Sequence, residues 1–329
     1  MARGVLVAAL RLAVIWSAPA SPAATPAAPV PVPPSTESVC ERVSRELLEI
    51  ERMEGADVAL ARLDALQAAD PAVAGICHAV AHDLGHAALL AAGGSVTVAL
   101  GPRDDVCGGG FIHGVIETAL GTSTRPERDL LRVCAPAQDG SCWHGIGHGL
   151  MFSTGMDVDR SLGLCDRAPS GRLSSRCGEG VFMQLFSAEG SGGHTAHLAS
   201  MAPTPESARG ICSATRLPYS ANCWFYAPTL VLAEHPDDFA AAMAWCREAT
   251  TRDGRQVCAR GVGSRTIKYH PDDPTVGARV CAAAGRLGDA CLGGMGSYWS
   301  VHFKGEREPS DVCSRLGDAA LERRCLAVT

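Results

Sequence analysis

The sequence lacks the features by which many common functions are recognised. Its 329 residues carry a formal charge of −6 and contain no basic run, so nothing in its charge favours nucleic acid or an anionic membrane as a partner. No CxxC or CxxCH spacing occurs, which argues against zinc knots made of cysteine and against covalent c-type haem. The Gly-x-Ser-x-Gly, P-loop and dinucleotide-binding fingerprints are also absent. The function therefore has to be inferred from the distribution of cysteine and histidine.

Cysteine is abundant, and its abundance bears on the compartment. The chain has 15 cysteines, too many for a reduced cytosolic protein of this size. Residues 1–23 have a basic start, an apolar run and small residues, the layout of a secretory signal peptide. An uncleaved membrane anchor is the alternative, although the run is short for a span. We place a Pro/Ala-rich linker at 24–36 and one helical domain at 37–329, with no membrane span after signal removal. The sequence thus predicts a secreted, periplasmic or cell-envelope protein.

Eight cysteines recur at nearly constant intervals, which indicates an internal repeat. The intervals are 30, 35, 35, 46, 35, 33 and 34 residues, between Cys77, Cys107, Cys142, Cys177, Cys223, Cys258, Cys291 and Cys325. A period near 34 is typical of stacked helix pairs. Four units also contain proline followed by acidic residues, as expected for the first turn of a helix. The sequence therefore predicts an all-α fold of about seven disulfide-stapled helix-hairpin repeats, forming a curved solenoid or an α/α toroid.

Most units have a second cysteine at the end of the first helix, close to the one that begins the second helix. These positions lie together in an antiparallel helix hairpin, so they can reach bridging geometry. We predict six short-range disulfides: Cys134–Cys142, Cys165–Cys177, Cys212–Cys223, Cys246–Cys258, Cys281–Cys291 and Cys313–Cys325. We also expect Cys40 to pair with Cys77, which leaves Cys107 over. Glycines recur early in the second helices, which indicates close approach of neighbouring backbones, because glycine in a helix otherwise costs about 1 kcal/mol.

The histidines follow the first three units rather than the repeat as a whole. Side chains four residues apart share a helix face, and equivalent positions of a repeat share a face of the protein. Alignment on the cysteines brings seven side chains to one face of three neighbouring helices: His78, His82, His86, His113, Glu117, His144 and His148. Six imidazoles and a carboxylate in one patch form a set of metal ligands. They suit a divalent transition metal such as Zn, Fe or Cu.

The expected distances between helices limit how this patch can be used. Adjacent helices lie about 8–10 Å apart, so ligands on the first and third helices are not expected to share an ion. We predict one site formed by His82, His86, His113 and Glu117. A second site would use His144 and His148, with Glu117 able to bridge two ions. His78 lies one turn to the side and contributes least. Buried, hydrogen-bonded histidines without metal are the alternative interpretation.

Two local features give weaker indications of function. The segment HDLGH, residues 82–86, resembles the HExxH helix of zinc metalloproteases, but Asp83 stands where those enzymes have a glutamate general base. We nevertheless expect Asp83 to be the catalytic base. Cys107 near His113 suggests a nucleophile, although a cysteine that has lost its partner explains it better. The loop that carries His194 and His197 is expected to be an exposed loop, with closure over the patch as the alternative.

Two functions remain open at this point. The first is a secreted metal-dependent enzyme, hydrolytic or oxidative, that acts through the His/Glu site. The second is a non-catalytic, disulfide-rich repeat scaffold that binds protein, peptide or glycan. In both cases we expect a small-molecule or peptide ligand on the concave face of the repeat. An open coordination position favours the enzyme, whereas a closed site or no metal favours the scaffold.

Overall fold

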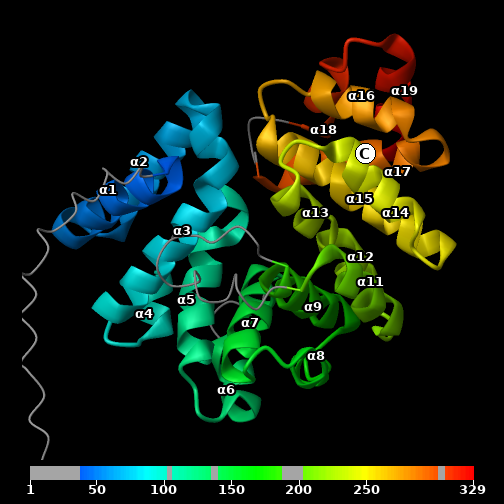
Figure 1. Ribbon diagram of the computed structural model, residues 1–329. Coiled ribbons are helices and arrows are strands. Elements are labelled where there is room, and N and C mark those ends of the chain that lie inside the picture. Colours follow the sequence, from blue (N-terminus) through cyan, green and yellow to red (C-terminus); the bar gives the residue numbers. More distant parts are fainter. Residues whose placement is uncertain (1–37, 102–105, 135–139, 187–202, 303–307) are drawn as a thin grey trace, which may run out of the picture. The chain divides into compact units, whose positions relative to one another are not determined.

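The computed structural model describes residues 38–101, 106–134, 140–186, 203–302 and 308–329, and over these residues the protein consists of helices without strands (Figure 1). The predicted signal peptide, the linker and the loop with His194 and His197 lie outside the described residues. The first half contains α1 (Val39–Glu54), α2 (Ala56–Ala69), α3 (Pro71–Ala91), α4 (Val96–Leu100), the 3₁₀ helix η1 (Cys107–Gly109), α5 (Gly110–Gly121), α6 (Pro126–Val133), α7 (Gly140–Ser153), α8 (Val158–Cys165) and α9 (Gly171–Leu185). The second half contains α11 (Pro205–Ala214), α12 (Ser220–Tyr226), α13 (Pro228–Glu234), α14 (Phe239–Arg247), α15 (Arg252–Tyr269), α16 (Thr275–Ala283), η2 (Gly285–Leu287), α17 (Gly288–His302), α18 (Pro309–Ser314) and α19 (Ala319–Val328).

Helix starts follow the signals in the sequence. Pro71 occupies the first turn of α3, and the side chain of Asp70 accepts a hydrogen bond from the backbone N–H of Ala72. Thr204 caps α11 in the same way, with Pro205 in its first turn. Proline is tolerated there because the first N–H groups of a helix have no partner within the helix. Three of the four predicted proline-led helices, α6, α11 and α18, begin at their proline, whereas α14 begins at Phe239, three residues after Pro236.

Seven disulfides join the described helices, and the six predicted short-range pairs are confirmed. Most of them join a short helix to the longer helix that follows it. The predicted pairing of Cys40 with Cys77 is wrong: Cys77 is bridged to Cys107, with their Cα atoms 5.6 Å apart, and Cys40 lies outside the seven bridges. The reason is packing, because α3 lies against η1 and α5, which brings Cys107 next to Cys77. So many intramolecular disulfides suggest an oxidising, extracellular compartment.

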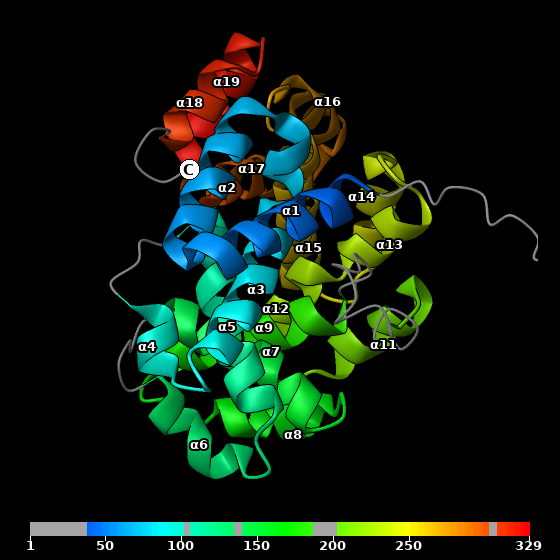
Figure 2. The same ribbon diagram turned by 90° about the vertical axis from the view of Figure 1, so that its left-hand side faces the viewer.

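Glycines allow the longer helices to pack closely. The pairs α3–α5, α5–α7, α7–α9 and α15–α17 pack side by side, and α1 and α2 pack on α3 (Figures 1 and 2). A Cβ atom added to Gly85 would clash with the carbonyl oxygen of Phe111, and one added to Gly263 would clash with that of Cys291. The predicted close backbone approach is therefore confirmed. Whether the hairpins form an open solenoid or a closed toroid stays a prediction.

A pair of glycine substitutions tests this packing. Gly263→Ala should lower the free energy of unfolding by roughly 3 kcal/mol, because the added methyl group meets a backbone carbonyl that cannot move independently. Gly163, in α8, is exposed and has open space around it, so Gly163→Ala should raise stability by up to about 1 kcal/mol through helix propensity. Thermal unfolding followed by circular dichroism measures both. Equal effects of the two variants would contradict the packing role.

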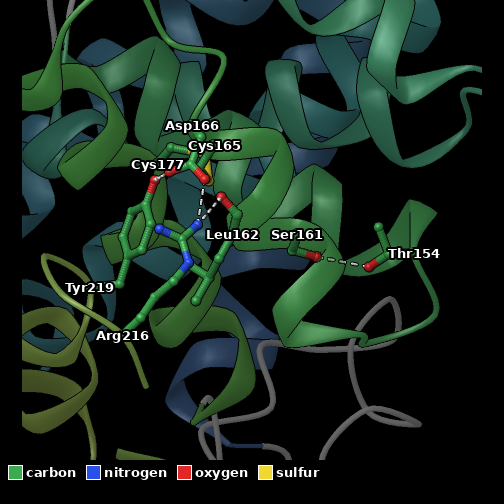
Figure 3. The surroundings of a disulfide bond; sticks show 8 residues. All are labelled: Thr154, Ser161, Leu162, Cys165, Asp166, Cys177, Arg216 and Tyr219. Atoms are coloured by element: carbon green, nitrogen blue, oxygen red, sulfur yellow. Dashed lines mark hydrogen bonds and ion pairs between the residues drawn. A yellow bond between two sulfur atoms is a disulfide. The ribbon is translucent and has the colours of Figure 1, made fainter. Parts of the chain in front are cut away.

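The hairpin of α8 and α9 shows how one disulfide is fixed to the next hairpin (Figure 3). Asp166 follows Cys165, and its carboxylate accepts a hydrogen bond from the Tyr219 hydroxyl at 2.8 Å and forms an ion pair with Arg216. Burial and this hydrogen bond raise the pKa of Tyr219 to about 12, so its hydroxyl remains a donor at neutral pH. These contacts join the α8–α9 hairpin to the segment that leads into α12.

The histidine-rich helix α3 is also apolar. It is the one helix among the described residues with the length and composition of a membrane span, and half of that stretch is buried inside the protein. A buried core helix of a soluble protein meets the same criteria, so this finding is weak support for a span.

Candidate metal centre

The seven predicted side chains come from three helices that pack side by side. Helix α3 carries His78, His82 and His86, helix α5 carries His113 and Glu117, and helix α7 carries His144 and His148. Glycines bring these helices together beside the histidines themselves. A Cβ on Gly114 would clash with the carbonyl oxygen of His82, and one on Gly145 would lie 3.1 Å from the Cα of His113. All seven side chains therefore point into one space.

The structure brings the donor atoms together in three overlapping groups. Within each group the atoms lie within 4.8 Å of one another: His78, His82 and His113; His113, His144 and His148; His82, His86 and Glu117. His82 on α3 and His148 on α7 lie closer than the expected helix spacing allows, with ring centroids 5.1 Å apart, although none of the three groups combines ligands from these two helices. The glycine contacts explain the difference, because they allow closer packing than ordinary side chains do.

In the first group, a hydrogen bond at one ring nitrogen of His78 and of His82 determines which nitrogen faces the other histidines. Nδ1 of His78 lies 2.8 Å from the carbonyl oxygen of Cys107, so it donates its proton there. Nδ1 of His82 lies 3.1 Å from Oε2 of Glu117 and donates to that carboxylate. In neutral rings this leaves the two Nε2 lone pairs facing each other at 3.2 Å, and Nδ1 of His113 lies 3.4 Å from Nε2 of His78.

This inner arrangement fits a metal ion. Two nitrogens bound tetrahedrally to one zinc, each at about 2.0–2.1 Å, lie roughly 3.3–3.4 Å apart. An ion between His78 and His82 would also remove the repulsion between their lone pairs. A carbonyl or carboxylate that holds the opposite ring nitrogen is the usual outer contact of a metal-binding histidine. The sequence assigned His78 the least important place, and the structure instead puts it at the centre of this group.

The second group is buried and short of hydrogen-bond partners. His113, His144 and His148 are 1–3% exposed. Among the described residues, Nε2 of His113, Nε2 of His148 and both ring nitrogens of His144 have no hydrogen-bond partner. Nδ1 of His148 lies 2.8 Å from Oε1 of Gln184, so Nε2 carries the lone pair that faces inward. Buried nitrogens without partners are costly in a protein, and a bound ion would account for them.

Burial also sets the charge of this group. It lowers the pKa of His148 to about 4, helped by the nearby His82. Burial and neighbouring histidines lower the pKa of His113 well below its usual value, and burial together with Arg176 does the same for His144. All three imidazoles are therefore neutral at pH 7, which is the form that binds a metal.

In the third group a buried carboxylate lies between two histidines. Glu117 is 2% exposed; its Oε2 faces Nδ1 of His82, and its Oε1 lies 3.4 Å from Nε2 of His86. Burial alone would raise the pKa of Glu117, but the hydrogen bond to His82 and the close contact with His86 outweigh burial and lower the pKa. Burial also opposes the charged form of His86. Its interaction with Glu117 outweighs burial and raises the pKa of His86. The carboxylate is thus ionised and offers negative charge to a cation.

The remaining predicted residues have other places. Asp83 is half-buried on α3, and its carboxylate accepts a hydrogen bond from the hydroxyl of Ser44. Cys107 cannot serve as a nucleophile while it is bridged to Cys77. Sequence reasoning missed Gln184, because its role depends on the packing of α9 against α7, which no pattern in the chain reveals.

A cavity of about 540 Å³ leads to this cluster. We call it the first cavity. On the side of the cluster its lining residues are His78, His82, Asp83, His86, Glu117, His148 and Gln184. Helices α13 and α15 provide further lining residues such as Thr229, Leu232 and Lys268. The volume is within the range of sites for small organic molecules.

No family model, curated protein or solved structure matches the chain. The class of protein therefore follows from the fold and the site. It is a disulfide-rich, all-helical protein with buried histidine clusters that could bind metal.

Proposed function

We propose that the cluster binds divalent transition metal ions and is the catalytic centre of a secreted metal-dependent enzyme. The observation that carries this proposal is the set of buried ring nitrogens directed at one another, with Glu117, Gln184 and the Cys107 carbonyl holding opposite ring positions. A transition metal bound there would polarise a substrate oxygen or activate water, and iron or copper would add oxidative chemistry.

The imidazole and carboxylate ligands favour two ions of a borderline-soft metal such as zinc. Two of the three groups share no residue, namely His82–His86–Glu117 and His113–His144–His148, and His78 lies between them. An ion in the first of these groups would replace the proton that Nδ1 of His82 donates to Glu117 in the metal-free protein. Each group provides three protein ligands, which leaves a position open, as in catalytic zinc sites. Imidazole and carboxylate suit Zn, Fe and Cu. Asp83 lines the first cavity beside these ligands and is our candidate for the general base that takes a proton from water entering through that cavity.

We also propose that the hairpin units are repeats of one unit of about 34 residues. Support comes from the disulfide that recurs between a short helix and the longer one after it. In this arrangement the cluster belongs to the first three units, and the later units contribute the other walls of the cavities.

Metal analysis of the disulfide-intact protein tests the proposal. After dialysis against Zn²⁺, Fe²⁺ or Cu²⁺ and removal of loosely bound metal, we expect about two ions per chain. In the cobalt-substituted protein, azide should change the visible absorption spectrum, because an open position accepts it. Failure to retain any of these metals would contradict the proposal. Retained cobalt with a spectrum that azide leaves unchanged would favour the non-catalytic scaffold.

A further inference from the structure

A second cavity of about 490 Å³ reaches the same cluster from other residues. His78, His113 and His144 line it, whereas most of its remaining wall comes from α9, α12, α15 and α17. His113 and His144 do not line the first cavity, and His78 lines both. A molecule in the second cavity would thus contact His113 and His144, which a molecule in the first cavity does not reach.

The wall of the second cavity is strongly basic, although the chain as a whole is acidic. Four cationic side chains line it: Arg176, Arg260, Arg265 and Lys268. Glu179 is the one carboxylate among its described lining residues, and it forms an ion pair with Arg176. Arg260 and Arg265 line this partly open cavity, where an anion would be attracted more strongly than at a flat exposed surface.

Arg265 gives the sharpest indication of a ligand. It is only 7% exposed, and among the described residues no carboxylate lies within ion-pair distance of its guanidinium. Its Nε donates to the hydroxyl of Thr229 at 3.1 Å, and its Nη1 lies 3.4 Å from the hydroxyl of Ser264. A buried charge held only by neutral groups is costly unless an opposite charge joins it. A planar guanidinium matches the two oxygens of a carboxylate or phosphate.

Aromatic rings define the rest of the pocket. The guanidinium of Arg265 lies 5.3 Å from the ring centroid of Phe225 and 5.0 Å from that of Tyr226, and Tyr298 also lines the cavity. These rings hold the guanidinium by cation–π contact and offer flat apolar surface beside it. The cavity therefore suits a molecule with an anionic end and a planar or apolar body.

We propose that the second cavity is the substrate site, and that it binds a small organic oxyanion, a carboxylate or a phosphate ester. Arg265 holds the anionic end, with Arg260 beside it, and the body of the molecule lies along the aromatic wall toward His113 and His144. The assignment of this cavity as a substrate site rests on the proposed metal centre. Binding of the anion does not, because Arg265 and Arg260 are not among the metal-binding groups.

Calorimetric titration with benzoate, phenyl phosphate and the neutral benzamide tests this proposal in metal-free and zinc-loaded protein. At least one anion should bind about tenfold or more tightly than benzamide in both forms, since only an anion gains the charge-assisted contacts. Arg265→Gln should weaken that binding about tenfold or more while leaving zinc content unchanged. Arg216→Gln, which alters an arginine in the Asp166 ion pair instead, should bind like the wild type.

Other outcomes separate this inference from the proposed metal centre. Arg260 is exposed, so Arg260→Gln will fold even if Arg265→Gln does not, and it should also weaken anion binding. Equal affinity for the anions and benzamide, or unchanged binding in both arginine variants, would overturn the proposal. Anion binding only in zinc-loaded protein and independent of the arginines would do the same, yet would leave the metal centre intact. Loss of zinc with retained anion binding would remove the metal centre alone.

Discussion

His113→Ala will lower the affinity for zinc by about a hundredfold or more, and His82→Ala will do the same. Each of these histidines belongs to two of the three donor groups, so each substitution removes a ligand from two places at once. Loss of an outer contact alone typically costs 10–100-fold in metal affinity, and loss of a ligand costs more. Competition with a chromophoric chelator measures the change. His270→Ala is the matched control, because His270 pairs with Asp237 outside the cluster.

A variant that removes a hydrogen-bond partner of a ligand, and not the ligand itself, should have a smaller effect. Gln184→Ala keeps every ligand but removes the acceptor that lies 2.8 Å from Nδ1 of His148. We expect it to weaken zinc binding by about 10–100-fold, less than the ligand variants do. Buried histidines without a metal role predict a different result, in which all three variants destabilise the protein and zinc affinity is negligible throughout. Unchanged zinc content in both His82→Ala and His113→Ala would contradict the proposed centre.

The sequence predicts local features of this fold better than long-range ones. The short-range disulfides follow from hairpin geometry, since the end of one helix must lie near the start of the next. The pairing of Cys77 with Cys107 spans 30 residues and depends on how α3 lies against η1 and α5. A spacing pattern carries no information about that packing. The same limit explains why Cys40 was assigned to the wrong partner.

The candidate site shows the same division. Spacing by four residues was enough to select all seven side chains of the cluster. Their grouping was not predictable, because it depends on glycine contacts such as Gly114 against His82, which bring the helices closer than usual. Residues from the second half of the chain, such as Arg265, carry no motif. They join the site only because α15 contacts α3.

The metal-free protein will lose stability as the pH falls from 7 to 5. His148 has a pKa of about 4 in the folded protein, and the pKa values of His113 and His144 lie well below 6.5, the usual value that the unfolded chain restores. Between the folded-state and unfolded-state pKa values, the unfolded chain binds more protons than the folded protein does. The free energy of the unfolded chain therefore falls relative to that of the folded state. At pH 5 the loss for His148 is about 2 kcal/mol, and His113 and His144 add losses of the same sign. His86 acts in the opposite direction, because its pKa is raised and its protonated form favours the folded state.

A melting series in chelator at pH 7, 6 and 5 measures this effect, and the net loss should lower the melting temperature by about 4 °C or more. Glu117 does not interfere, because its lowered pKa removes stability only when the pH falls below about 4.5, the ordinary value of a glutamate. The double variant His144→Gln, His148→Gln should show a shallower dependence on pH, since two of the three groups no longer titrate. A dependence of equal slope in this variant would mean that other groups cause the acid sensitivity. A flat series in the wild-type protein would mean that these imidazoles keep their ordinary pKa values, which would contradict the role of burial in setting their charge.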